Sequence, residues 1–319
     1  MTTVQHSRTR RKLSTIILAA GIGKRMYSKT PKVLYEILGK PILSFVIDVA
    51  KEIKSNEIII VVGKTAFEIN KAIGHEVKYA IQPIPKGTGD AAKKGIDISA
   101  HGNVLILCGD VPLLKKETLT ELLNHHQKMK ADLTLLTCQV KNPFGYGRIV
   151  RDRRNNILTI VEQADATIEQ QKIKEINAGV YYGRKKLILS ALKKIDTKNR
   201  QGEFYLTDVI KEMLKKKKKV VGLKIDAEEE ITGINSKMDL SRVREVVKKK
   251  WFEQLMAEGV FIEDPTTTNI DLSVRIGKFV HIRPHTLIEG KTRIKDGLTI
   301  GPFAWIKDGK RQKHKKDIE

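Results

Sequence analysis

The sequence predicts an α/β protein, in which a mostly parallel sheet with helices on both faces is followed by a long helix and a short parallel β-helix. Three patterns carry this prediction. Short β-branched runs alternate with amphipathic segments from Leu13 onward, and apolar residues recur at helical spacing over 241–259. Isoleucine then recurs at every sixth position from Ile270 to Ile306.

Alternating strands and helices fill the first half of the chain. Strands are predicted at 15–20, 57–62, 77–81, 103–108 and 133–140. Helices are predicted at 41–51, 65–73, 89–98 and 116–129. Because such alternation builds a parallel sheet through right-handed crossovers, ligands are expected beyond the carboxyl ends of its strands. The loop at 21–26, which follows the first strand, is therefore expected at the site.

A different pattern begins after Leu133. Its predicted elements are a hairpin of 148–151 with 158–162 around an Asn155-Asn156 turn, a strand at 177–182 and a helix at 184–194. The sixfold spacing is typical of a triangular coil, in which each face contributes one inward aliphatic residue. At about eighteen residues per coil the array supplies about two coils. Its open end is expected to expose Ile294, Ile300 and Ile306 unless the Lys-rich tail or another subunit covers them.

These patterns predict the following division of the chain. A basic leader occupies 1–12, an α/β domain 13–240, a helical linker 241–262, a truncated hexapeptide-repeat β-helix 263–307 and a basic tail 308–319.

Composition and charge restrict the class of protein. The 319 residues carry a net charge of +23, which attracts anions such as nucleotides, sugar phosphates, nucleic acid or acidic lipid. Cys108 and Cys138 lie far apart without a metal-binding pattern, which excludes a disulfide framework and favours a reducing cytoplasm. No apolar run approaches the roughly 20 residues of a membrane span, and 1–12 lacks the apolar core of a secretory signal. The expected location is therefore cytoplasmic.

The loop after the first strand has the composition of a phosphate-binding segment. Glycines at 21 and 23 allow close approach of main-chain N–H groups to phosphate oxygens, and Arg25 and Lys32 supply cations. On spacing alone, an ordinary strand-to-helix turn with surface cations explains the same residues equally well.

The segment 18–26 followed by Pro31-Lys32 resembles the motif of sugar-nucleotide pyrophosphorylases. Further segments resemble one branch of that group in order, and they include Gln82 with Gly87-Thr88-Gly89, Gly109-Asp110-Val111-Pro112, Gly145-Tyr146-Gly147-Arg148, Glu162, Glu175-Ile176-Asn177, 201–208 and Gly233-Ile234-Asn235. Together with the sixfold repeat, they resemble the bifunctional N-acetylglucosamine-1-phosphate uridyltransferase / glucosamine-1-phosphate acetyltransferase family. The resemblance runs from about Leu13 to Ile306. It implies a Rossmann-like sheet of the nucleotide-diphospho-sugar transferase type, followed by a left-handed β-helix.

The resemblance also implies a role for each matched residue. UTP and N-acetylglucosamine 1-phosphate would be the substrates, and Mg²⁺ the cofactor. Arg25 and Lys32 would act in catalysis, and Asp110 and Asn235 would hold the metal. The nucleotide would contact Ala19, Gly21, Gln82, Gly87 and Thr88, and the sugar would contact Gly147, Glu162 and Asn177. Without the resemblance, Glu162 and Asn177 are better explained as a hairpin-end Glu and a strand Asn that face solvent.

Four features of the sequence either depart from the family pattern or have no predicted role in the reaction. Cys108 stands where the family usually has an aromatic residue, and Asp90 stands where it commonly has His or a neutral residue. The β-helix stops before the family's acetyl-transfer site, so acetyl transfer is expected to be absent. Histidines at 75, 101, 125 and 126 are expected at the surface because the reaction needs no general base.

Several alternatives stay open at this stage. A pyrophosphorylase for another hexose 1-phosphate or for dTTP would share most of these motifs. A basic nucleic-acid-binding protein is disfavoured because no recognised nucleic-acid motif accompanies the lysine runs. An inactive remnant is disfavoured because Arg25, Lys32, Asp110 and Asn235 are intact. No membrane partner is expected, and a homotrimer through the β-helix is a further possibility.

Overall fold

The computed structural model describes residues 12–21 and 23–312, which form two compact units. The first unit contains the described residues up to Lys24 together with Leu43–Gly233, and the second contains Arg25–Ile42 with Ile234 and the described residues after it. Most of the predicted leader and of the predicted tail lies outside the described residues. An early segment of the chain thus belongs with the C-terminal unit.

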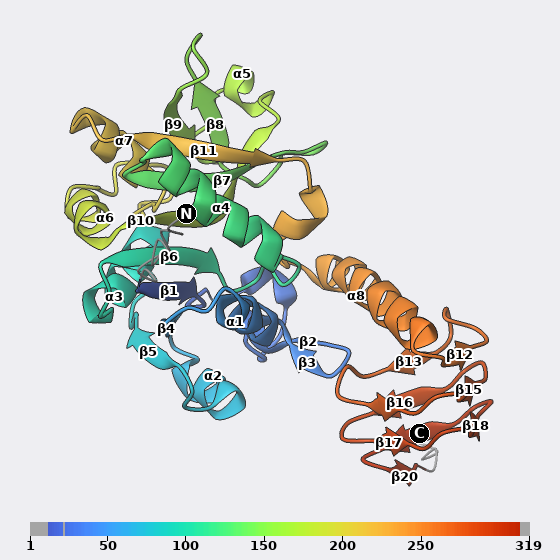
Figure 1. Cartoon of the computed structure of the whole chain (residues 1–319). Helices are drawn as coiled ribbons and strands as arrows, with labels where there is room; N and C mark the ends of the chain where they lie inside the picture. The colour runs from blue at the N-terminus through green and yellow to red at the C-terminus, as the bar shows by residue number, and fades with distance from the viewer. Residues whose placement is uncertain (1–11, 22, 313–319) are drawn as a thin grey trace, which may run out of the picture. The chain divides into compact units, whose positions relative to one another are not determined.

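A mixed sheet forms the centre of the first unit, in the order β11–β7–β10–β6–β1–β4–β5, with a β8–β9 hairpin attached to β10 (Figure 1). Its strands are β1 (Leu13–Leu18), β4 (Glu57–Val62), β5 (Lys78–Ile81), β6 (Asn103–Cys108), β7 (Leu133–Gln139), β8 (Arg148–Arg151), β9 (Ile157–Val161), β10 (Glu175–Arg184) and β11 (Val220–Ile225). The predicted parallel pairing is confirmed for β6, β1, β4 and β5. Strand β10 runs antiparallel to both β6 and β7, which makes the sheet mixed.

Helices cover both faces of this sheet. They are α1 (Ile42–Glu52), α2 (Ala66–Ile73), α3 (Thr88–Ile98), α4 (Lys116–Met129), α5 (Ile168–Gln171), α6 (Lys185–Leu192) and α7 (Asp208–Lys215), with a 3₁₀ turn η3 (Glu228–Ile231). Helices α3, α6 and α7 share one buried cluster with Ile16, Ile106 and Leu135 of the sheet. Because successive strand residues face opposite sides, Thr134 points to the other face, where α4 packs over β7, β10 and β11.

One expectation about the surface is wrong. His126 of α4 is 6% exposed, and its Nδ1 lies 2.8 Å from Thr134 Oγ1 while its ring meets Tyr182 edge-on. The neighbouring His125 is only partly buried. Adjacent helical residues point in directions about 100° apart, so only one of the two histidines faces the sheet.

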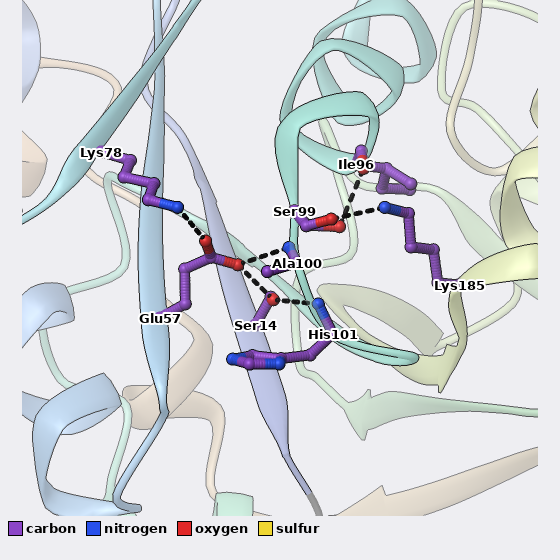
Figure 2. A network of polar contacts seen from close by, with 8 residues as sticks. All are labelled: Ser14, Glu57, Lys78, Ile96, Ser99, Ala100, His101 and Lys185. Atoms are coloured by element: carbon purple, nitrogen blue, oxygen red, sulfur yellow. Dashed lines mark hydrogen bonds and ion pairs between the residues drawn. The ribbon is translucent and has the colours of Figure 1, made fainter.

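A hydrogen-bond network joins the amino ends of the parallel strands (Figure 2). The Glu57 carboxylate accepts hydrogen bonds from Ser14 Oγ at 2.5 Å, Lys78 Nζ at 2.6 Å and the Ala100 main-chain N at 2.9 Å. The Glu57 side chain is 7% exposed. This carboxylate therefore ties the starts of β1, β4 and β5 to the segment that leads into β6, at the edge opposite the carboxyl ends.

The second unit combines a hairpin, a long helix and a stack of short strands. The hairpin is β2 (Glu36–Ile37) with β3 (Lys40–Pro41), and the 3₁₀ turns η1 (Lys24–Met26) and η2 (Lys32–Leu34) precede it. Helix α8 (Lys237–Ala257) begins before the predicted residue 241. Ser236 and Asp239 form a capping box there, with reciprocal side-chain to main-chain hydrogen bonds that fix the helix start.

The stacked strands confirm the period of the isoleucines. They are β12 (Phe261–Ile262), β13 (Asn269–Ile270), β14 (Arg275–Ile276), β15 (His281–Ile282), β16 (Leu287–Glu289), β17 (Arg293–Ile294), β18 (Thr299–Ile300), β19 (Trp305–Lys307) and β20 (Lys310–Arg311). From β13 onward, parallel pairing joins residues 18 positions apart, as in Arg275 and Arg293. The inward isoleucines pack with Phe252 and Leu255 of α8 in one core.

The last coil is less exposed than expected. Ile294 is buried, and Ile300 and Ile306 are half-buried. Strand β20 turns back antiparallel on β19, through Asp308 and Gly309 at φ 49° and 75°. Two successive residues at positive φ are typical of the tight hairpin turn that Asp-Gly favours. This hairpin covers one face of the last coil.

Candidate active site

Loops from neighbouring strands meet at the carboxyl edge of the parallel part of the sheet. Gln82 follows β5, Gly63 follows β4, Ala19 follows β1, and Gly109 and Asp110 follow β6. Since β5, β4, β1 and β6 are hydrogen-bonded in this order, the four loops lie side by side. This is the edge at which open α/β sheets bind ligands.

Gly21 borders open space in this edge. A Cβ atom built on Gly21 would meet nothing within 4 Å. Ala19, in contrast, is buried, and its main-chain N donates to Val61 O over 2.9 Å. The loop thus leaves the sheet at Ala19 and passes beside unfilled space at Gly21, where a ligand could approach the main chain.

The loop before α3 is held by a second segment of the same unit. Gly87 has φ +103°, and a Cβ there would lie 2.5 Å from Phe204 O. Thr88 Oγ1 accepts a hydrogen bond from Leu206 N at 3.0 Å, and Gly89 N donates to Phe204 O at 2.7 Å. These contacts explain why glycine is required at 87, and they join two of the segments that carried the sequence resemblance.

The three residues predicted to bind the sugar lie together. Asn177 N donates to Gly147 O over 2.9 Å, and a Cβ on Gly147 would lie 3.4 Å from Glu162 Oε2. Gly147 precedes β8, Glu162 follows β9 and Asn177 belongs to β10. The hairpin therefore brings its two ends against β10, and any larger residue at 147 would fill the space beside the Glu162 carboxylate.

Glu162 is a carboxylate with few donors around it. It is half-buried, and the one hydrogen bond described for it comes from Thr207 Oγ1 at 2.9 Å. Burial raises the pKa of Glu162, and the charges of Asp208 and Asp165 add to this, against the opposing effects of Thr207 and Arg148. Such a group is suited to accept a hydrogen bond from a ligand that excludes water.

A bulge in β10 orients Asn177. The register against β7 shifts between Asn177 and Tyr181, and Gly179 within the bulge has φ +73°. Gly179 N donates to Asn177 Oδ1 at 3.1 Å, so the Asn177 NH₂ group remains as a donor. A Cβ on Gly179 would lie 2.7 Å from Cys108 Sγ. Cys108 thus packs directly against the bulge that holds Asn177.

The structure adds Tyr181 and Thr207 to the residues around Glu162, and neither had a role predicted from the sequence. Tyr181 is 2% exposed, and its hydroxyl has no hydrogen-bond partner among the described residues. Burial raises the pKa of Tyr181 well above its ordinary value, and Glu162 and Cys108 raise it further. Asn177 is close enough to act on this pKa in the opposite direction without completing a hydrogen bond to the hydroxyl. No local motif marks Tyr181 in the sequence, whereas Thr207 lies in the matched segment 201–208.

The predicted phosphate and metal residues are divided between the units. Asp110 lies half-buried in the first unit, whereas Arg25, Lys32 and Asn235 belong to the second. Arg25 is exposed, and Lys32 Nζ donates to Asn235 Oδ1 at 3.1 Å. Within the described residues, no group of three or more His, Cys, Asp or Glu side chains could hold a metal ion.

Comparison with known proteins identifies the family. The sequence profile described as "Nucleotidyl transferase" matches residues 14–251. The chain belongs to the nucleotidyl transferase family. This nucleotidyl transferase is 41% identical over 297 residues to the bifunctional protein GlmU of Caldanaerobacter subterraneus subsp. tengcongensis, and 43% identical over 297 residues to that of Thermoanaerobacter pseudethanolicus. Each match covers 93% of this chain, which spans 65% of the length of either relative.

Solved structures show the same fold for this nucleotidyl transferase. A UDP-glucose pyrophosphorylase complexed with UDP-glucose aligns with a TM-score of 0.63 at 17% identity, covering 76% of this chain and 100% of the other. A putative glucose-1-phosphate thymidylyltransferase from Bacillus anthracis aligns with a TM-score of 0.59 at 20% identity, covering 73% and 94%. Across the described part of the chain, no helix has the length and apolar character that a membrane crossing requires.

Proposed function

We propose that the chain transfers UMP from UTP to N-acetylglucosamine 1-phosphate, forming UDP-N-acetylglucosamine and pyrophosphate. The observation that carries the proposal is the grouping of Gly147, Glu162 and Asn177 beside β6 in a nucleotidyl transferase sheet. Relatives at 41% and 43% identity that are named bifunctional protein GlmU support the choice of branch.

The proposed reaction is a direct displacement at phosphorus. A phosphate oxygen of the sugar phosphate, already ionised at neutral pH, bonds to the α-phosphorus of UTP as the bond to the bridging β-phosphate oxygen breaks. Pyrophosphate leaves with that electron pair, and no general base is required. Arg25 and Lys32 would neutralise the β- and γ-phosphates, so that positioning and electrostatic stabilisation supply the catalysis.

Asp110 and Asn235 fit the proposed role of Mg²⁺ ligands by their chemistry. Mg²⁺ prefers oxygen donors and is commonly held by one or two protein groups, with substrate phosphates and water completing its shell. A carboxylate and an amide oxygen, with no larger acidic cluster among the described residues, suit that arrangement. When bound, Mg²⁺ would supply positive charge that screens the two phosphate groups from each other.

The sugar residues favour an N-acetylated hexose. Glu162 would accept a hydrogen bond from a sugar hydroxyl, the Asn177 NH₂ group would donate to the acetamido oxygen, and Gly147 would leave room for both. The alternative is a pyrophosphorylase for another hexose 1-phosphate or for dTTP, because such an enzyme would share this fold and most of these motifs.

A substrate panel decides between these possibilities. Pyrophosphate release is measured with UTP or dTTP and with N-acetylglucosamine, glucose or galactose 1-phosphate, each with and without Mg²⁺. We expect UTP with N-acetylglucosamine 1-phosphate to give the highest kcat/KM and to require Mg²⁺. A higher kcat/KM with glucose 1-phosphate or with dTTP would replace this proposal by the alternative.

The stacked strands of the second unit are proposed to form a short left-handed β-helix. A homotrimer formed through the β-helix stays a prediction, and light scattering of the purified chain tests it. A cytoplasmic location also stays a prediction.

A further inference from the structure

Gln82 follows β5 directly, and the start of α3 holds its side chain. Its main-chain N donates to Val62 O over 2.8 Å, which extends the sheet by one residue, and the residue is 3% exposed. The side-chain Nε2 lies 3.1 Å from Gly87 O and 2.8 Å from Asp90 Oδ2. Gly87 caps α3 and Asp90 lies in its first turn.

Both partners of this side chain can only accept hydrogen bonds. A main-chain carbonyl and a carboxylate offer lone pairs and no hydrogen, so only the NH₂ group of Gln82 can face them. Turning the amide over would place its oxygen against two acceptors and would lose both hydrogen bonds. The chemistry of Gly87 O and the Asp90 carboxylate therefore determines which way the Gln82 amide faces.

The oxygen Oε1 is then the group that Gln82 can offer to a ligand. Both N–H hydrogens are used, and no donor from the described residues is found at Oε1. A nucleobase that meets Oε1 must present an N–H group. Where the ring N3 of a pyrimidine faces Oε1, uracil and thymine present an N–H group, whereas N3 of cytosine is an acceptor, and two facing acceptors repel each other.

We propose that Asp90 is a specificity-determining positioning residue of the nucleotide site. It fixes the Gln82 amide so that the site takes a base with an N3–H group and rejects cytosine. The inference rests on the proposed contact between Gln82 and the base, and Asp90 acts through Gln82 without touching the nucleotide. The first turn of α3 suits a carboxylate, because the positive end of the helix dipole stabilises negative charge.

Equilibrium binding of UTP and CTP to the full chain, measured by calorimetry, tests the proposal without requiring turnover. We expect wild type to bind UTP more tightly than CTP. Asp90→Leu keeps the approximate size but cannot accept a hydrogen bond, and it is expected to reduce this preference by about tenfold. Asp90→Asn retains a carbonyl oxygen that accepts from Gln82, and it should keep most of the preference if Asp90→Leu folds poorly.

A control substitution in the same helix tests whether the effect of Asp90→Leu depends on the position of the carboxylate or only on the loss of one negative charge. Asp97→Asn removes one negative charge from a half-exposed residue that pairs with Lys93 at 3.6 Å, and it should leave the UTP preference unchanged. In a Gln82→Ala background, Asp90→Leu should have no further effect on the ratio, because Asp90 would have lost the side chain through which it acts.

Specific results would overturn the proposal. They are equal binding of UTP and CTP by wild type, an unchanged preference in Asp90→Leu, or an effect of Asp90→Leu that persists in the Gln82→Ala background. Uridylyl transfer is assayed separately. A chain that prefers UTP in binding yet releases no pyrophosphate would contradict the proposed function alone.

Discussion

Lys32 donates a hydrogen bond from Nζ to Asn235 Oδ1 over 3.1 Å, joining two residues 203 positions apart within the second unit. Lys32 lies in η2, and Asn235 precedes the capping residue of α8. The proposed roles of the two residues differ, since one neutralises phosphate and the other binds metal. Their contact means that a change in either side chain also removes a hydrogen bond from the other.

The first prediction follows from this pair. Lys32→Ala and Asn235→Ala are each expected to lower kcat/KM by about tenfold or more, and the double variant should lose less than the product of the two effects. A double-mutant cycle on pyrophosphate release measures the coupling. Lys237→Ala, an exposed change beside the same helix start, serves as the control. Strictly multiplicative effects would contradict a functional pair.

The second prediction concerns the metal. Asp110→Ala should abolish Mg²⁺-dependent turnover, because it removes a carboxylate ligand, and it should shift the thermal midpoint little since Asp110 lies in a loop at a strand end. Turnover is titrated with Mg²⁺ and unfolding is followed by circular dichroism. Glu76→Gln, which changes an exposed carboxylate, should behave as wild type. Normal Mg²⁺ dependence in Asp110→Ala would refute the assigned role.

The third prediction rests on the raised pKa of Glu162. Burial of the carboxylate is the largest cause of this shift. An acid whose pKa is raised takes up its proton at a higher pH than usual, and the neutral form is a weaker acceptor. The KM for the sugar phosphate should therefore rise as the solution is acidified, and the rise should begin at a higher pH than the ordinary carboxyl pKa would give. Glu162→Gln cannot titrate and should show a higher but flatter KM profile.

The comparison of these two profiles removes the titration of the substrate phosphate, which is common to both. The KM for UTP, measured in the same series, should be similar in wild type and Glu162→Gln at each pH. Parallel sugar profiles for wild type and Glu162→Gln would show that Glu162 does not titrate in contact with the sugar.

The fourth prediction compares one substitution at two tyrosines. Tyr181→Phe removes a buried hydroxyl without a protein partner, so the free energy of unfolding should stay unchanged or rise by up to about 1 kcal/mol. Tyr79→Phe removes a hydroxyl that donates to Gly74 O at 2.7 Å, and it should lower the free energy of unfolding by about 0.5–1.5 kcal/mol. Urea unfolding measures both. Destabilisation by Tyr181→Phe would indicate an ordered water as the missing partner.

The fifth prediction concerns the Glu57 network. Burial raises the pKa of Glu57, but hydrogen bonds from Lys78, Ser14 and Ala100 outweigh it and hold the pKa below its ordinary 4.5. A carboxyl with a lowered folded pKa contributes stability above its unfolded pKa, and this contribution is lost as pH falls through the folded pKa.

Glu57→Ala should accordingly reduce the free energy of unfolding by about 1–3 kcal/mol at neutral pH, and the deficit should shrink as pH falls below 4.5. Activity of the folded variant should be retained, because the network lies at the amino ends of the strands. Glu121→Ala, on the exposed side of α4, is the control and should show no such pH dependence. A deficit that is constant with pH would mean that packing, and not the charge, is responsible.

Local patterns predicted much of the fold. The bounds of β4, β6, β8 and α4 match the sequence prediction, because each is a short periodic run with clear flanking residues. The sixfold isoleucines predicted the register of the stacked strands, since each inward residue must meet the next coil. Features set by distant partners were not predictable in this way, as the antiparallel direction of β10 and the burial of His126 against Thr134 illustrate.

In the candidate site, too, local sequence patterns predicted some features, and contacts between distant residues determine the others. The alternation of strands and helices predicted that the glycine-rich loop lies at a strand end, whereas the family resemblance indicated Gln82 and Asp110. The contact of Gly147 with Asn177 and the surroundings of Tyr181 depend on a hairpin folding back and on a bulge, and neither leaves a periodic pattern. Asp90 was noted only as an added charge, because its role depends on a side chain eight positions earlier in the chain.

The hairpin of β19 and β20 has a consequence for association between molecules. A coil of parallel strands is a template, because its last strands offer unpaired main-chain groups to any further strand. Strand β20 runs antiparallel along β19 and uses that edge, and it presents Lys310 and Arg311 to solvent. A second molecule that added a strand to this face would therefore meet the two-residue strand β20 and not β19, and the lysine and arginine oppose the flat, uncharged stacking from which fibrils grow.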